Sequence, residues 1–277
     1  MTGVQTCALP ISALSVLLFI VGVWMMPGRA PAQVPGMFQP LLMASSRPIA
    51  WDASSASTSP GTNSANTLDL TSLTVSSGLV NGAIYACVAL SQTGGTSPVL
   101  QWNATGTPQS FTLKASFNGG SGRSEAWELK NPTAGNKTLR YTYTGTAGNI
   151  IMNAASFNNV GTGYVSNTTN TGTSTLTTVG PLTVAAGGAS FDCPVNPGNL
   201  TTPRSQTLVG ANSAQSVIAA GMQYNVGTTN PTFSWTNVNT TWATMAVVME
   251  PETGSPWSST RNTRSASPSN EIGRAHV

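Results

Sequence analysis

The segment from Ser124 to Asn158 most strongly limits the folds open to this chain, because it contains three consecutive strand-like runs. In the middle run, Leu139, Tyr141 and Tyr143 alternate with polar residues. Apolar and aromatic residues at every second position, between breaks of Gly, Asn and Pro, are the pattern of a half-buried antiparallel strand. The segment therefore predicts three antiparallel strands joined by tight turns.

Strand patterns continue from Pro48 to Pro251 at spacings of roughly 8–12 residues, with no amphipathic helix between them. The run Ala83–Leu90 is apolar on both faces, which fits a strand inside a sandwich or a buried helical segment. Its short length and the preceding Gly82 favour the strand. We expect an all-β fold: a single, jelly-roll-like antiparallel β-sandwich domain over residues 48–251, with disordered tails.

Charge is scarce in this chain: only 7% of residues are charged, against roughly 25% in an average globular protein. Six basic and six acidic residues balance each other between Pro48 and Pro251, so the net charge of +3 comes from outside that range. No basic face for nucleic acid is indicated. Solubility rests on Ser, Thr, Asn and Gly, which we associate with extracellular β proteins.

The two ends of the sequence resemble translated sequencing-adapter DNA. Codons that encode Thr6–Ile11 have a reverse complement that encodes Ile272–Val277. We interpret residues 1–12 and 271–277 as adapter-derived and non-native, and set them aside as one would an expression scar.

This interpretation removes the only histidine, His276, and one of the three cysteines, Cys7. A Ser-His-Asp triad, a Cys-His pair and a histidine-bearing zinc site are then excluded. We expect no enzymatic activity, no cofactor and no metal.

The run Ala13–Met26 is uncharged and shorter than the roughly 20 residues that span a bilayer. Residues 13–32 are either a truncated signal peptide, cleaved after Ala30-x-Ala32, or upstream sequence that is not natively translated. Residues 33–47 are predicted to be a linker. The Ser/Pro/Arg-rich residues 252–270 predict a disordered tail.

Three short similarities link the two halves of the chain. Two Greek-key halves of one jelly roll would produce them, and so would coincidence in a biased composition. The pairs are Gly82–Cys87 with Gly188–Cys193, Asn131-Pro132 with Asn230-Pro231, and Ala147–Phe157 with Thr240–Glu250.

The motifs IAWDASS (from Ile49), GAIYACVALS (from Gly82), SEAWELKNPTAGNKTLRYTYTG (from Ser124) and TTWATMAVVMEP (from Thr240) occur in that order. This arrangement resembles an uncharacterised family of jelly-roll-like β-sandwich proteins from environmental bacteria and phages. The resemblance covers residues 48–251 and implies the fold. It implies no activity, because no catalytic signature comes with it.

Glu125 and Glu128 come nearest to a catalytic carboxylate pair. Residues three apart on a strand point to opposite faces, so the two cannot flank one glycosidic bond. We expect them to pair with Arg123, Lys130 or Arg140 instead.

Trp102 precedes the turn Asn103–Gly106 and is the best candidate for an exposed, ligand-binding aromatic that could stack on a sugar ring. The other strand aromatics are predicted to fill the core. These are Trp127, Trp235, Trp242, Tyr141 and Tyr143.

Cys87 and Cys193 occupy matching positions in two of the similar segments. They form a disulfide if those strands are neighbours and are buried thiols if they are not.

These observations favour a non-catalytic, extracellular structural or adhesive protein: a surface, filament or virion-decoration subunit. A carbohydrate-binding, lectin-like module is the alternative. The expected partners are further copies of this chain or a cell-surface glycan, but no nucleic acid. Contact with a membrane is expected only through the possible N-terminal signal segment.

Overall fold

A computed structural model describes the chain in segments that together cover most of the predicted domain. They are residues 47–52, 57–58, 62–91, 95–119, 122–146, 148–198, 200–214, 218–237 and 241–252. All lie in one compact unit, Met43–Val277. The adapter-derived ends, the segment 13–32, nearly all of the 33–47 linker and all of the 252–270 tail except Glu252 lie outside the described residues.

The regular structure of these segments is antiparallel β-sheet, and the all-β prediction is confirmed. Among the described residues, no helix is long and apolar enough to cross a bilayer.

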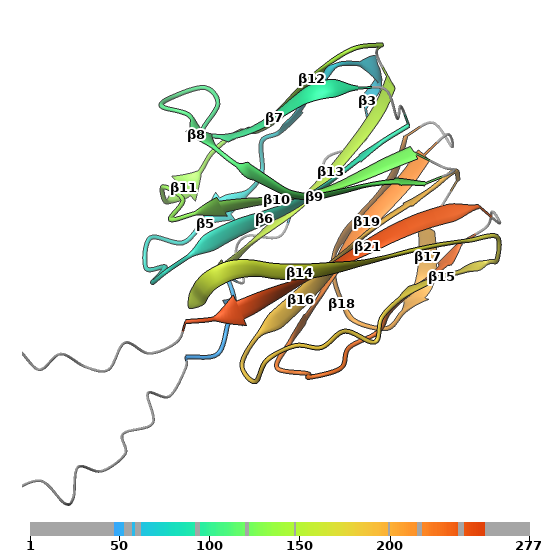
Figure 1. Ribbon diagram of the computed structural model, residues 1–277. Coiled ribbons are helices and arrows are strands. Elements are labelled where there is room, and N and C mark those ends of the chain that lie inside the picture. Colours follow the sequence, from blue (N-terminus) through green and yellow to red (C-terminus); the bar gives the residue numbers. More distant parts are fainter. Residues whose placement is uncertain are drawn as a thin grey trace, which may run out of the picture. The chain divides into compact units, whose positions relative to one another are not determined.

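The first half of the described chain builds two sheets (Figure 1). The first inner sheet has the order β1 (Ala50–Trp51), β13 (Gly148–Asn158), β6 (Ala83–Leu90), β10 (Gly122–Lys130), β9 (Thr112–Gly119). Two further short strands, β2 (Ser57–Thr58) and β3 (Thr62–Ala65), also pair with β13. The first outer sheet has the order β4 (Thr67–Leu70), β12 (Leu139–Thr144), β7 (Thr96–Trp102), β8 (Gln109–Ser110). A small ribbon pairs β5 (Thr74–Val75) with β11 (Gly135–Asn136).

The second half builds two more sheets. The second inner sheet has the order β14 (Val160–Gly172), β21 (Trp242–Pro251), β16 (Ala189–Asn196), β19 (Ile218–Val226), β18 (Thr207–Ala214). The second outer sheet has the order β15 (Leu176–Val179), β20 (Phe233–Asn237), β17 (Leu200–Arg204).

Four sheets thus stack as layers: outer, inner, inner, outer (Figure 1). One apolar core lies between the first outer and first inner sheets, a second between the two inner sheets, and a third between the second inner and second outer sheets. Each half is therefore a sandwich, and the two sandwiches pack through their inner sheets.

The layers explain the strand patterns. In β12, Leu139, Tyr141 and Tyr143 are buried while Arg140 and Thr142 are half-exposed, because an outer sheet has a core on one face only. In β6 every residue is buried, because an inner sheet has a core on both faces.

The two sandwiches repeat one design. The order β13-β6-β10-β9 in the first inner sheet matches β21-β16-β19-β18 in the second. Packing is reciprocal: β13 contacts β18 and β19, and β21 contacts β9 and β10. The repeats are thus related by a pseudo-twofold axis, near which β6 packs on β16. The similarities in sequence mark these equivalent strands, and each copy supplies a whole sandwich rather than half of one.

The described chain enters and leaves this unit at one place. Arg47 and Glu252 form an isolated antiparallel bridge. Close by, the Ile49 amide donates to the Gly187 carbonyl at 2.8 Å.

Candidate functional site

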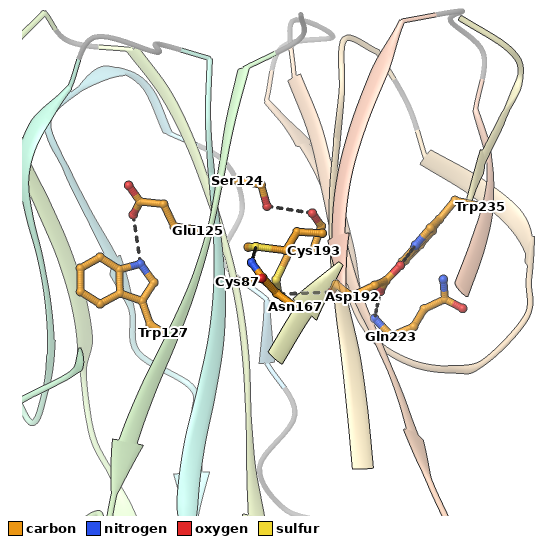
Figure 2. The surroundings of a disulfide bond; sticks show 10 residues. Cys87, Ser124, Glu125, Trp127, Asn167, Asp192, Cys193, Gln223 and Trp235 are labelled. Carbon is orange, nitrogen blue, oxygen red and sulfur yellow. Dashed lines mark hydrogen bonds between the residues drawn. A yellow bond between two sulfur atoms is a disulfide. The ribbon is translucent and has the colours of Figure 1, made fainter. Parts of the chain in front are cut away.

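A disulfide joins Cys87 of β6 to Cys193 of β16, across the interface of the two inner sheets (Figure 2). Their Cα atoms are 5.4 Å apart, and both residues are buried. The period of two places Tyr85 and Cys87 on the face of β6 toward the second sandwich, and Ile84 and Ala86 on the other face. Of the two states that the sequence left open for these cysteines, the structure contains the bridge.

Polar groups flank the disulfide. The Ser124 hydroxyl donates to the Cys193 carbonyl at 2.8 Å and so adds a second link between the inner sheets. Asp192 directly precedes Cys193 in the chain. Its side chain points away from the disulfide, into the core of the second sandwich (Figure 2).

Asp192 is fully buried, and two donors hold its carboxylate. The Trp235 indole N–H donates to Oδ2 at 2.6 Å, and the Gln223 amide N–H donates to Oδ1 at 2.8 Å. The Gln223 side chain extends the network by donating to the Ser234 carbonyl at 3.1 Å and accepting from the Gln206 amide at 2.9 Å. Burial raises the pKa of Asp192 to about 7, and the hydrogen bonds counteract only part of that effect.

Two further hydroxyls lie on the same face of the second inner sheet. The Oγ of Ser190 and the Oγ1 of Thr244 are buried without a protein hydrogen-bond partner.

Glu125 is the buried acid of the first sandwich. Its Oε1 pairs with Arg123 Nε at 2.8 Å, and its Oε2 accepts from the Trp127 indole at 3.0 Å. Burial raises the pKa of Glu125, and the nearby Arg123 acts in the opposite direction.

Glu128 lies on the other face of β10, as the spacing predicted. Tyr85 donates to its Oε1 at 2.6 Å, and Lys114 pairs with its Oε2 at 2.7 Å. The two glutamates thus have separate structural partners and form no catalytic pair. Of the expected basic partners, Arg123 binds Glu125, whereas Arg140 pairs with Asp69.

The prediction that Trp102 is exposed is wrong. The side chain is fully buried in the first sandwich, and its indole donates to the Thr133 carbonyl at 2.8 Å. Its position is set by β7, whose alternation directs Leu100 and Trp102 inward, and the adjacent turn does not change that direction. The other strand aromatics lie in the core as predicted: Trp127, Trp235, Trp242, Tyr141 and Tyr143 are buried.

Comparison with protein-family models, with curated proteins and with solved structures found no match. The resemblance to jelly-roll-like sandwich proteins of bacteria and phages remains a prediction.

A hollow of about 330 Å³ lies where β10 ends beside the start of β14. Lys130 lines it, and its ammonium donates to the carbonyls of Val160 at 3.0 Å and Gly161 at 2.6 Å. Burial lowers the pKa of Lys130. This cation holds two strands together, and its bonds account for its position without a ligand.

Among the described residues, no three His, Cys, Asp or Glu side chains come close enough to hold a metal ion. The polar groups around the disulfide link layers: the Ser124 hydroxyl joins the two inner sheets, and the Asp192 carboxylate joins the second inner sheet to the second outer sheet. Sequence reasoning missed Asp192 as the centre of such a network. The available signal was a single acid inside the otherwise apolar run Phe191–Val195, because a buried acid needs buried partners.

Proposed function

We propose that this protein is a non-catalytic structural subunit that works outside the cell, as part of a surface layer, a filament or a virion decoration. The observation that carries the proposal is the Cys87–Cys193 bridge at the centre of the interface between the repeats. Disulfides form and persist in oxidising compartments, and a bridge between two sandwiches fastens them into one block that keeps its shape under load.

The composition supports the same proposal. A chain with 7% charged residues presents a neutral surface of hydroxyls and amides to its surroundings. Such a surface suits close packing between copies, because few charges have to be paired or desolvated at the contact.

The experiment is export of the full chain to a bacterial periplasm, followed by light scattering and negative-stain electron microscopy of the purified protein. We expect self-association that grows with concentration, and two cysteines that resist thiol labelling until the protein is reduced. A chain that stays monomeric at every concentration would overturn the proposal. Saturable binding on a glycan array would replace it by the carbohydrate-binding alternative, which no described aromatic side chain now specifically favours.

A further inference from the structure

Strand β14 is an edge of the second inner sheet, and no described strand other than β21 pairs with it. Its last seven residues, Ser166–Gly172, pair with β21 in uninterrupted register. The residues from Ser166 to Thr171 are all exposed, on both faces of the strand. Figure 1 shows β14 as a long ribbon along the border of its sheet. The strand therefore offers a straight, solvent-facing backbone.

The direction of that backbone follows from one hydrogen bond. The Thr171 amide N–H donates to the side-chain Oδ1 of Asn170 at 2.9 Å, and we infer that it points away from β21. A strand that pairs with Thr171 would replace the Asn170 oxygen as its acceptor. Alternate residues of an antiparallel strand point the same way. The N–H and C=O groups of Asn167 and Thr169 consequently also face outward, where another strand could pair with them.

The regular segment Ser166–Gly172 of β14 lacks the features that usually block such pairing, whereas the pairing with β21 is irregular twice before it, between Val160 and Gly163 and between Tyr164 and Ser166. Exposed edges are commonly short, charged, interrupted or marked by proline. Residues 160–172 contain no charge and no proline. In the first repeat, the equivalent place beside β13 is taken by three short strands, β1, β2 and β3, which break that edge into pieces.

Exposed apolar side chains lie on β14 and on a neighbouring strand. Val165 of β14 is 45% exposed and Leu176 of β15 is 50% exposed. β15 contacts β14. The charged side chains bonded to β14, which are Lys130, Glu128 and Glu250, all contact its start, residues 160–164. The regular segment beyond them is polar and partly apolar, which favours contact with a surface of the same character.

We propose that β14 pairs antiparallel with β14 of a second copy of this chain, with Thr169 opposite Thr169 of that copy. Thr169 is the midpoint of the regular segment, so this register sets Asn167 opposite Thr171 and Ser166 opposite Gly172. No like charges meet, and facing threonines are a favourable cross-strand pair. The second inner sheets of the two copies, each of five strands, would become one continuous sheet. This inference rests on the proposed function and names the partner and the contact.

β18, at the opposite edge of the same sheet, is less suited to be the partner. Both β2 and β17 contact it. Pairing of β14 with β18 of another copy would be head-to-tail, and would yield a ring or a chain of growing length rather than a twofold dimer.

Disulfide trapping tests the register directly. Residues facing each other in a hydrogen-bonded antiparallel pair have Cα atoms about 5.5 Å apart, within the range that a disulfide spans. Thr169→Cys, in a Cys7→Ser background, is expected to give a covalent dimer on mild oxidation. Thr229→Cys, in the exposed loop between β19 and β20, is the matched control and should remain monomeric on a non-reducing gel.

Sedimentation equilibrium supplies the second measurement. Thr169→Pro removes only an outward N–H, and proline is tolerated at such edge positions, so the fold should persist. We expect the dimer dissociation constant to rise at least tenfold in Thr169→Pro and in Thr169→Lys. Thr229→Lys should leave it unchanged.

The outcomes separate this inference from the proposed function. Wild-type assemblies that persist in both Thr169 variants, with no trapped dimer, overturn the β14 contact and leave the structural role standing. If the wild type forms long chains, Thr169→Pro abolishes them and no dimer is trapped, the symmetric register is overturned and pairing of β14 with β18 takes its place. A wild-type chain that never associates overturns both.

Discussion

The Asp192 carboxylate accepts the Trp235 indole N–H at 2.6 Å, and this bond ties the second inner sheet to the second outer sheet. The acid has no basic partner in its network, so its charge is opposed by burial and compensated only by dipoles. The hydrogen bond is thus short, while the ionised form of Asp192 costs free energy because it is buried.

This cost predicts a stability that falls as pH rises. The pKa of Asp192 is raised to about 7 in the folded state, so the folded protein keeps a proton that the unfolded chain releases near pH 4. The contribution of Asp192 to stability should therefore be fully present below about pH 4 and be lost up to about pH 7, by on the order of 4 kcal/mol. The raised pKa of Glu125 acts in the same direction. Urea unfolding between pH 4 and 8 measures the slope, and Asp192→Asn should flatten it. An equal slope in that variant would contradict the assignment to Asp192.

Gly221 of β19 leaves room for the Trp235 ring. A Cβ at this position would overlap the Trp235 ring at Cη2, so Gly221→Ala must displace the indole from Asp192. We expect a loss of roughly 1–3 kcal/mol in the free energy of unfolding, as for overpacked cores, together with a shift in tryptophan fluorescence. Gly78→Ala is the control, because a Cβ there meets no atom within 4 Å. A loss of the same size at Gly78 would show that the effect is not due to packing on Trp235.

Removal of the disulfide should weaken the whole unit. The bridge joins residues separated by 106 positions, and cross-links of that span contribute about 2–5 kcal/mol, largely through the unfolded chain. Cys87→Ser combined with Cys193→Ser should lower the thermal midpoint by the corresponding amount, measured by differential scanning calorimetry. Cys7→Ser serves as the matched control. A double variant as stable as the parent would mean that the inner-sheet core alone holds the repeats together.

Trp102→Ala should destabilise the fold without acting on any ligand. The ring fills the first sandwich and its N–H is bonded, so its removal leaves a large cavity and an unpaired carbonyl at Thr133. We expect a cost of about 3–5 kcal/mol in chemical denaturation. If the variant kept its stability but lost binding on a glycan array, Trp102 would be an exposed, ligand-binding side chain, as the sequence suggested.

The sequence patterns predicted which faces of each strand are buried, but not what buries them. Ala83–Leu90 is apolar throughout because β6 lies between two cores, and the period-two pattern of β12 marks a strand with one. Neither pattern says whether the second layer belongs to the same sandwich or to a repeat. The four layers were therefore not foreseen, although the equivalence of Cys87 and Cys193 pointed to them.

The polar network was beyond sequence reasoning for a related cause. Asp192 finds its partners at Gln223 and Trp235, on strands brought together only by the folded topology. The misplaced Trp102 has a local cause, since nearness to a turn was weighed above strand alternation.

The bridge between Arg47 and Glu252 has a mechanical consequence. A pull applied between these two positions would break hydrogen bonds one after another, instead of loading a whole row of hydrogen bonds at once. An assembly built from this unit would be strongest if force passed from copy to copy through strands such as β14, and weakest if force passed along the polypeptide.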